Sequence, residues 1–205
     1  MNKKIIVVEG YLAAGKSTFT RQLSKAINVP YLIKDTFKIA LCESIPITNR
    51  EEGSRFSVVT FDAMMYVVER LMETNSPVII EGNFAATGMK KKDEAGVIKS
   101  LVDKYAYQSL TYKFIGDTQV LYDRYIERNR SPERGDANRE FVEPSYDVFD
   151  GYCHNLRKFN IGGKVEIIDT TDFMKVDFTT HIENARLFIA FPQPHACQQS
   201  VGNGF

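Results

Sequence analysis

The stretch Gly10-Tyr11-Leu12-Ala13-Ala14-Gly15-Lys16-Ser17 fits the pattern GxxxxGKS at every fixed position, and it constrains the fold of the whole chain. Residues 4–9, just before it, are mostly β-branched and apolar, which is typical of a strand buried on both faces of a parallel sheet. Residues 17–27, just after it, have a helical pattern. A strand, a loop and a helix in this order let backbone N–H groups converge on a polyphosphate. The stretch therefore predicts a phosphate loop in an α/β domain.

The residue types in this loop each have a physical role in binding phosphate. We expect Lys16 to reach the β- and γ-phosphates as a point charge, and the Ser17 hydroxyl to supply one ligand to a magnesium ion. Gly10 and Gly15 permit a close approach of the backbone. A glycine-rich turn that merely links a strand to a helix would explain neither Lys16 nor Ser17.

The composition of the chain limits the classes of partner. Its 205 residues suffice for one α/β domain with a sizeable core, and its 26 basic residues balance 26 acidic ones. A general basic surface for nucleic acid is therefore not indicated, although a local basic groove is compatible with this balance. The 3 cysteines, Cys42, Cys153 and Cys197, are far apart and form no CxxC pair, which is typical of reduced thiols in a cytoplasmic protein. No apolar run is long enough for a secretory signal or a membrane span.

Asp35 follows the second predicted strand. Residues 29–33 form this short strand, and a helical pattern resumes at Phe37. Asp35 therefore lies at the carboxyl end of a strand, where open parallel sheets bind their ligands. An aspartate at this place also suits the cap of the following helix, and the sequence leaves both roles open.

Glu81 follows the third predicted strand, residues 77–80. In a protein with the phosphate loop, a carboxylate at this place commonly orients the magnesium ion, so Glu81 and Ser17 are the candidate metal ligands. The alternative is an ordinary charged residue in a turn. Glu81 also competes with Asp35 for the role of general base, because both residues end strands at the same edge of the sheet.

Arginines gather after the fourth predicted strand, residues 107–115. Arg124 and Arg128 lie on one face of a predicted helix over 118–128. Three further arginines follow in a polar stretch: Arg130, Arg134 and Arg139. Such a cluster in a neutral chain predicts a lid, over about 124–140, that closes on a polyphosphate and neutralises its charge. A solvated run of charges is the competing explanation, since carboxylates are interleaved. Arg128 and Arg134 are the first candidates for a catalytic role.

The remaining elements complete the domain. A long helix is predicted over 55–72, a fifth strand over 164–168, and a closing helix over 176–190. The tail, residues 192–205, has no periodic pattern. We expect a single domain over 1–191 with this tail at its periphery.

The order of these features resembles the small P-loop kinases. Within that superfamily the chain is most similar to the group that includes zeta toxins, chloramphenicol phosphotransferases and the kinase domain of polynucleotide kinases. The similarity rests on the phosphate loop, the carboxylates after strands two and three, the arginine-rich segment, and Asp169-Thr170-Thr171 after strand five. It extends over nearly the whole chain, to about Ala190.

The resemblance implies a three-layer α/β sandwich with a five-stranded parallel sheet in the order 2-3-1-4-5 and an arginine-rich lid. It implies ATP and Mg²⁺ as cofactors and a hydroxyl group as the phosphoryl acceptor. By position, Lys16 and Ser17 hold phosphate and metal, and Asp35 takes the proton of the acceptor. Arg128 and Arg134 match lid arginines, and Thr170 and Thr171 fall in the loop that borders the adenine. The other expected nucleotide contacts are Gly10, Ala13, Ala14, Gly15 and Thr18.

Several functions compete at this stage. A GTPase needs a guanine-reading NKxD motif, which is absent, and the DxxG string at 93–96 follows three lysines rather than an apolar strand. A polynucleotide 5′-hydroxyl kinase and a non-catalytic ATP-binding switch share the phosphate loop with a small-molecule kinase. The zero net charge favours an ATP-dependent phosphotransferase that acts on a hydroxyl of a small molecule. The sequence does not identify the acceptor or the oligomeric state.

Overall fold

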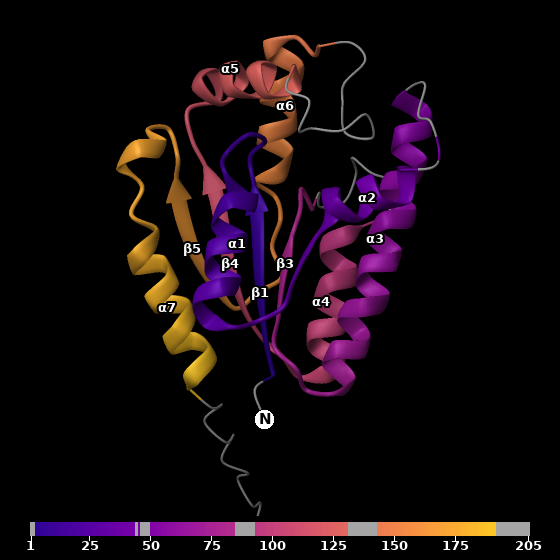
Figure 1. The fold of residues 1–205 in the computed structure, drawn as a ribbon, viewed down its shortest axis with the longest axis vertical. Helices are drawn as coiled ribbons and strands as arrows, with labels where there is room; N and C mark the ends of the chain where they lie inside the picture. The colour runs from indigo at the N-terminus through magenta and orange to yellow at the C-terminus, as the bar shows by residue number, and fades with distance from the viewer. Residues whose placement is uncertain (1–2, 44, 46–49, 85–92, 131–142, 192–205) are drawn as a thin grey trace, which may run out of the picture.

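A five-stranded parallel sheet forms the centre of the molecule (Figure 1). In this computed structural model the described residues are 3–43, 45, 50–84, 93–130 and 143–191. The strand order is β2-β3-β1-β4-β5, as predicted, and every neighbouring pair is parallel. The strands are β1 (Lys4–Gly10), β2 (Tyr31–Ile33), β3 (Val78–Glu81), β4 (Gln108–Ile115) and β5 (Lys164–Asp169).

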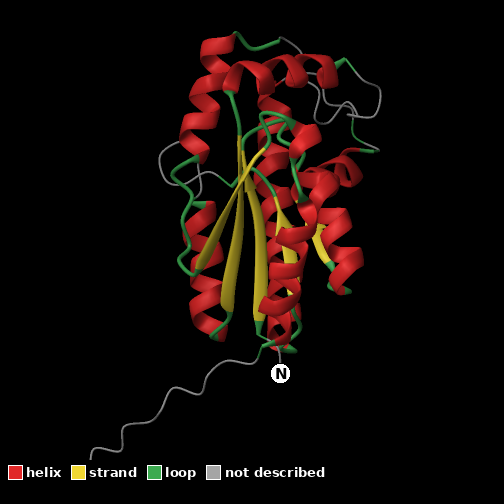
Figure 2. Cartoon of the chain, turned by 90° about the vertical axis from the view of Figure 1, so that its left-hand side faces the viewer, coloured by secondary structure: helices red, strands yellow, loops and turns green. Residues whose placement is uncertain are grey.

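Helices cover both faces of this sheet, which explains why β1 is buried along its whole length (Figure 2). Ile6 and Val8 point toward one core, which includes residues of α1 and α7, and Ile5 and Val7 point toward a second core under α3 and α4. The helices are α1 (Lys16–Ile27), α2 (Lys34–Cys42), α3 (Arg50–Glu73), α4 (Glu94–Tyr105), α5 (Thr118–Asn129), α6 (Tyr146–Leu156) and α7 (Phe178–Ala190), with a short 3₁₀ helix η3 (Phe173–Lys175). Within the described part of the chain, no helix is long and apolar enough to cross a membrane.

The carboxyl ends of the strands meet at one edge of the sheet, and α5 and α6 lie above that edge (Figure 1). Two boundaries differ from the prediction there. Helix α2 begins at Lys34, directly after β2, and not at Phe37, so Asp35 lies in its first turn. Helix α3 begins at Arg50 and not at 55. The N-cap of α2 is Ile33, with no side-chain cap, which argues against a capping role for Asp35.

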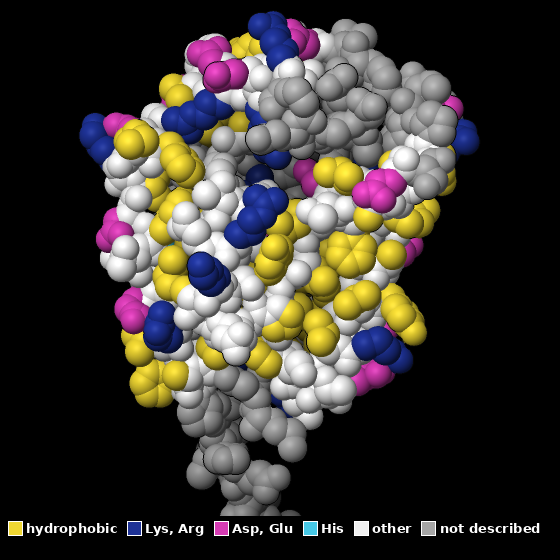
Figure 3. Space-filling view, in the orientation of Figure 1, with side chains coloured by type: hydrophobic (Ala, Val, Ile, Leu, Met, Phe, Trp, Pro, Cys, Tyr) yellow, Lys and Arg dark blue, Asp and Glu magenta, His cyan; other side chains and the backbone are white. Residues whose placement is uncertain are grey.

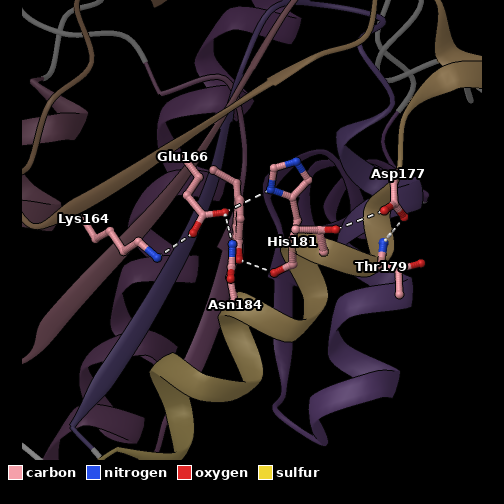
Figure 4. A network of polar contacts seen from close by, with 8 residues as sticks. Lys164, Glu166, Asp177, Thr179, His181 and Asn184 are labelled. Atoms are coloured by element: carbon pink, nitrogen blue, oxygen red, sulfur yellow. Dashed lines mark hydrogen bonds and ion pairs between the residues drawn. The ribbon is translucent and has the colours of Figure 1, made fainter.

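A polar network holds α7 against the edge strand β5 (Figure 4). Glu166 accepts hydrogen bonds from Asn184 at 3.2 Å and pairs with His181 at 3.0 Å and Lys164 at 2.7 Å. Burial alone raises the pKa of Glu166, but these partners together lower it below its ordinary value. The ionised carboxylate therefore stabilises the packing of the last helix on the sheet.

Glu9 is a fully buried acid at the carboxyl end of β1. The Nζ atom of Lys113, on the neighbouring strand β4, lies 3.4 Å from one of its carboxylate oxygens, and neither oxygen accepts a hydrogen bond. Burial raises the pKa of Glu9 to about 7, although the positive charges of Lys113 and Lys16 act to lower it. An ionised Glu9 therefore costs stability at alkaline pH.

We expect Glu9→Gln to weaken the pH dependence of stability. Between the ordinary pKa of 4.5 and the native value of about 7, the folded protein keeps a proton on Glu9 that the unfolded chain has released. The free energy of unfolding therefore falls as pH rises through this window, by about 3 kcal/mol in total. Urea unfolding at about pH 5 and about pH 8 measures this fall.

The control is Glu183→Gln, which changes an exposed carboxylate on α7. The wild type and this control should lose stability between the two pH values more steeply than Glu9→Gln. An equal loss in all three proteins would show that Glu9 does not titrate in this window.

Candidate functional site

The phosphate loop joins β1 to α1, and both of its glycines are required by the geometry. Gly10 has a φ of 122°, and a Cβ atom there would lie 2.1 Å from the carbonyl oxygen of Phe114 on β4. Gly15 has a φ of 81°, and its Cβ would lie 2.3 Å from the ring of Phe173. Any larger residue would push the loop away from β4 or from η3. Both glycines are therefore required by the packing around the loop, and their close approach to a phosphate stays a prediction.

Lys16 spans this loop from the inside. Its ammonium group donates hydrogen bonds to the carbonyl oxygens of Gly10, at 3.0 Å, and Tyr11, at 2.5 Å. Burial lowers the pKa of Lys16, and the negative charges of Glu81 and Asp35 oppose this shift. The cation is thus held at the loop with two carboxylates close by.

Ser17 and Glu81 lie next to each other at the mouth of the loop. The Ser17 hydroxyl donates to a carboxylate oxygen of Glu81 at 2.9 Å. Glu81 is 5% exposed, and burial raises its pKa to about 7 against the lowering effect of Lys16. A hydroxyl and a carboxylate beside a phosphate site are hard oxygen donors, which fit Mg²⁺, an ion usually held by one or two protein groups plus substrate phosphates.

A cavity of about 380 Å³ lies above the carboxyl ends of the strands and is lined by most of the predicted site residues. In the space-filling view, basic and acidic side chains meet at a hollow in the upper part of the molecule (Figure 3). The cavity is lined by Leu12, Ala13, Ala14, Gly15, Lys16, Ser17, Thr18, Arg21, Ile33, Asp35, Thr36, Ile39, Glu81, Asn83, Tyr125 and Arg128. The loop, both candidate carboxylates and one candidate arginine therefore share one space.

Asp35, in the first turn of α2, is exposed and lines this cavity. Its negative charge raises the pKa of Lys16 and of Glu81, so the three charged groups interact directly. Glu81, by contrast, is buried and bonded to Ser17. The two candidate bases thus occupy different environments at the same edge of the sheet.

The arginines after β4 have three different roles. Arg128, in the last turn of α5, lines the cavity, and its charge lowers the pKa of Lys16 and Glu81. Arg124, one turn earlier, instead donates to the carbonyl oxygens of Thr170 at 2.7 Å and Thr171 at 2.8 Å. Arg130 forms an exposed ion pair with Glu143 at 3.2 Å.

The structure describes the predicted lid, over about 124–140, only as far as residue 130. Its first part, from 124, belongs to α5 and the residue that ends it, and Arg134 lies outside the described residues. The predictions of a lid and of a catalytic Arg134 therefore stay predictions. The same holds for the peripheral tail, because 192–205 also lie outside the described part.

Thr170 and Thr171 do not line the cavity. Thr170 is fully buried, and its backbone N–H and hydroxyl both donate to the carbonyl oxygen of Ile115. The Thr171 hydroxyl donates to Asp169 at 2.7 Å. These bonds, with those from Arg124, fix the loop after β5, and its place at the adenine stays a prediction.

The sequence analysis did not select four further polar residues that line the cavity: Arg21, Thr36, Asn83 and Tyr125. Arg21 lies on α1, four residues after Ser17, so helical spacing could have placed it on the same face. Asn83 lies two residues after Glu81 in the same strand-end loop. Tyr125 looks like any packing aromatic on α5, and no sequence signal distinguishes it.

A larger and more open hollow, of about 700 Å³, lies between α3 and α4. Its lining includes Asp62, Tyr66, Glu69 and Lys104, and none of the predicted catalytic or binding residues. The smaller cavity is the candidate site, because it holds the buried charges and the phosphate loop.

Known structures share this fold over most of their length. A "putative kinase" from Chloroflexus aurantiacus matches with a TM-score of 0.80 and 18% identity, covering 92% of this chain and 99% of that one. A gluconokinase from Sinorhizobium meliloti matches with a TM-score of 0.54 and 16% identity, covering 92% of each chain. A shikimate kinase from Bacteroides thetaiotaomicron matches with a TM-score of 0.51 and 17% identity, covering 90% of this chain and 94% of that one.

No family model and no curated protein matches the sequence. At these identities the structural likeness concerns the fold, and the sheet order and the phosphate loop agree with it. The chain has the fold of the P-loop kinases.

Proposed function

We propose that the protein is an ATP-dependent phosphotransferase that moves the γ-phosphoryl group of ATP to a hydroxyl of a small molecule. The observation that carries this proposal is the single cavity that joins the phosphate loop to Asp35, Glu81 and Arg128. A phosphate-binding loop alone would serve a switch equally well. A carboxylate exposed in the same space, beside the place where the γ-phosphate would lie, is what an acceptor hydroxyl needs.

The residues divide the work by charge and position. Lys16 neutralises the β- and γ-phosphates, and Arg128 reaches the transferring group from α5, on the other side of the cavity. Ser17 and Glu81 would hold Mg²⁺, which supplies neutralisation of the phosphate charge when bound. Asp35 orients the acceptor hydroxyl and accepts its proton at a carboxylate oxygen.

Two observations favour a small acceptor. The cavity of about 380 Å³ also has to receive the terminal phosphates of the donor, which leaves room for an acceptor of modest size. Solved structures with this fold include a sugar kinase, a gluconokinase and a shikimate kinase, all named for small hydroxylated molecules. Arg21, at the cavity wall, could pair with an anionic group on such an acceptor, so hydroxy acids belong among the candidates.

The experiment that tests this function combines labelled ATP with panels of sugars, hydroxy acids, nucleosides, antibiotics and 5′-hydroxyl oligonucleotides. We expect transfer to a small molecule that requires magnesium, and loss of ATP binding or turnover in Lys16→Ala. Lys25→Ala, which changes an exposed lysine at the end of α1, is the matched control. Transfer to oligonucleotides alone would favour the polynucleotide kinase, and ATP binding without any transfer would favour the switch.

The roles of the two carboxylates can be separated by metal dependence. We expect Asp35→Asn to keep ATP binding and to lower turnover by roughly 10²-fold or more, the usual scale for a positioned base. We expect Glu81→Gln to raise the magnesium concentration needed for half-maximal rate, because it removes a charged oxygen ligand. Magnesium titrations of initial rate distinguish them. The reverse pattern would assign the metal to Asp35 and the proton to Glu81.

Arg128 should act mainly on the transition state. We expect Arg128→Ala to lower kcat by roughly 10²-fold or more with a smaller change in KM for ATP, because the charge it neutralises develops during transfer. Arg130→Ala, which among the described residues breaks an exposed pair with Glu143, is the control and should have wild-type kinetics. Equal kinetics in the two variants would refute the role of Arg128.

A further inference from the structure

Tyr11, the second residue of the phosphate loop, is held at three points. Its backbone N–H donates to Phe114 on β4 at 2.8 Å, and its carbonyl oxygen accepts the 2.5 Å hydrogen bond from Lys16. Its side chain is 1% exposed, and its hydroxyl accepts a hydrogen bond from Nε of Arg157. The position of the carbonyl that holds Lys16 therefore depends on what holds the ring of Tyr11.

Arg157 supplies this hold from a distant part of the sequence. It is the residue that ends α6, and its guanidinium also lies over the Tyr11 ring, with 5.3 Å between the guanidinium carbon and the ring centroid. The guanidinium thus both donates to the hydroxyl and makes a cation–π contact with the same ring, and an ammonium group lacks this planar, extended shape. Arg157 is not among the described residues that line the cavity.

The backbone of Arg157 is itself anchored to the sheet. Lys113, on β4, donates to the carbonyl oxygens of Arg157 and Phe159, both at 3.0 Å. The same ammonium group faces the buried carboxylate of Glu9 at 3.4 Å. One cation thus ties the end of α6 to β4 and to β1, the strand from which the phosphate loop starts.

We propose that Arg157 is a positioning residue for Lys16 and acts through Tyr11. This inference rests on the proposed function, because it assumes that Lys16 binds the β- and γ-phosphates of ATP. Without Arg157 the Tyr11 side chain loses a hydrogen bond and a cation–π contact, and the Tyr11 carbonyl is held less firmly. Lys16 then meets the phosphates in a less defined geometry, and small misplacements of such groups are costly.

The test compares nucleotides that differ only in their phosphates. In Arg157→Gln we expect the affinity for ATP to fall by roughly 10-fold, while the affinity for AMP stays unchanged because AMP has no group for Lys16 to bind. Tyr11→Phe keeps the ring and removes only the hydroxyl, so it should give a smaller loss of the same kind without risk to the fold. Lys158→Gln, which changes the exposed neighbour of Arg157, is the control.

Competition binding with ATP and AMP, with thermal unfolding of each variant, decides the result. A loss for ATP alone in Arg157→Gln and Tyr11→Phe, and none in Lys158→Gln, supports the inference. Equal losses for ATP and AMP would show a general structural role and overturn it, as would unchanged affinities in both variants. Failure of the wild type to bind ATP would overturn the proposed function and this inference together.

Discussion

The close approach of β1 to β4 at Gly10 is the constraint on which the candidate site depends. A Cβ atom at Gly10 would overlap the carbonyl oxygen of Phe114. Only glycine therefore fits at this last position of β1, beside β4, where the loop begins. The turn that follows brings the Gly10 and Tyr11 carbonyls over the Lys16 ammonium. A displaced Gly10 would therefore move the loop carbonyls and the lysine together.

Buried charges are concentrated at this edge of the sheet, although the chain as a whole is neutral. Lys16 and Glu81 are both buried, and the loss of hydration disfavours their charged forms. Each of the two charges partly offsets this effect by favouring the ionised form of the other group. Arg128 and Asp35 add opposite effects on the same two groups. The positive and negative side chains at this edge thus offset one another. Such a site suits a polyphosphate that binds together with its divalent cation.

The resemblance to the small P-loop kinases implied the sheet order, which the structure has. The residues themselves predicted the strand, loop and helix of the motif and the meeting of Asp35 and Glu81 with Lys16, because these depend on a local motif and on the rule that parallel strands end at one edge. The sequence indicated Arg128 and not Arg124 as a catalytic candidate, but it gave no role to Arg124. Both lie on one face of α5, but one helical turn places Arg124 over the loop after β5 and Arg128 over the cavity.

Contacts between distant segments were equally hidden from the sequence. Tyr11 and Arg157 are 146 residues apart, and a tyrosine in a phosphate loop gives no sign of its partner. The early start of α2 was also missed. Lys34 is not an obvious first helical residue, but its ammonium group forms a buried ion pair with Glu94 at the start of α4, which accounts for its place in the interior.

Burial helps to decide between the two candidate bases. A pKa of about 7 would suit Glu81 as a general base, but this value describes a carboxylate without a bound cation. A divalent ion beside Glu81 would favour its ionised form and occupy its oxygens, as the adjoining Ser17 hydroxyl already does in part. Asp35 has the opposite character, since its side chain is exposed and lines the cavity. Because phosphoryl transfer asks more of position than of basicity, we propose the exposed carboxylate as the base and the buried one as the metal ligand.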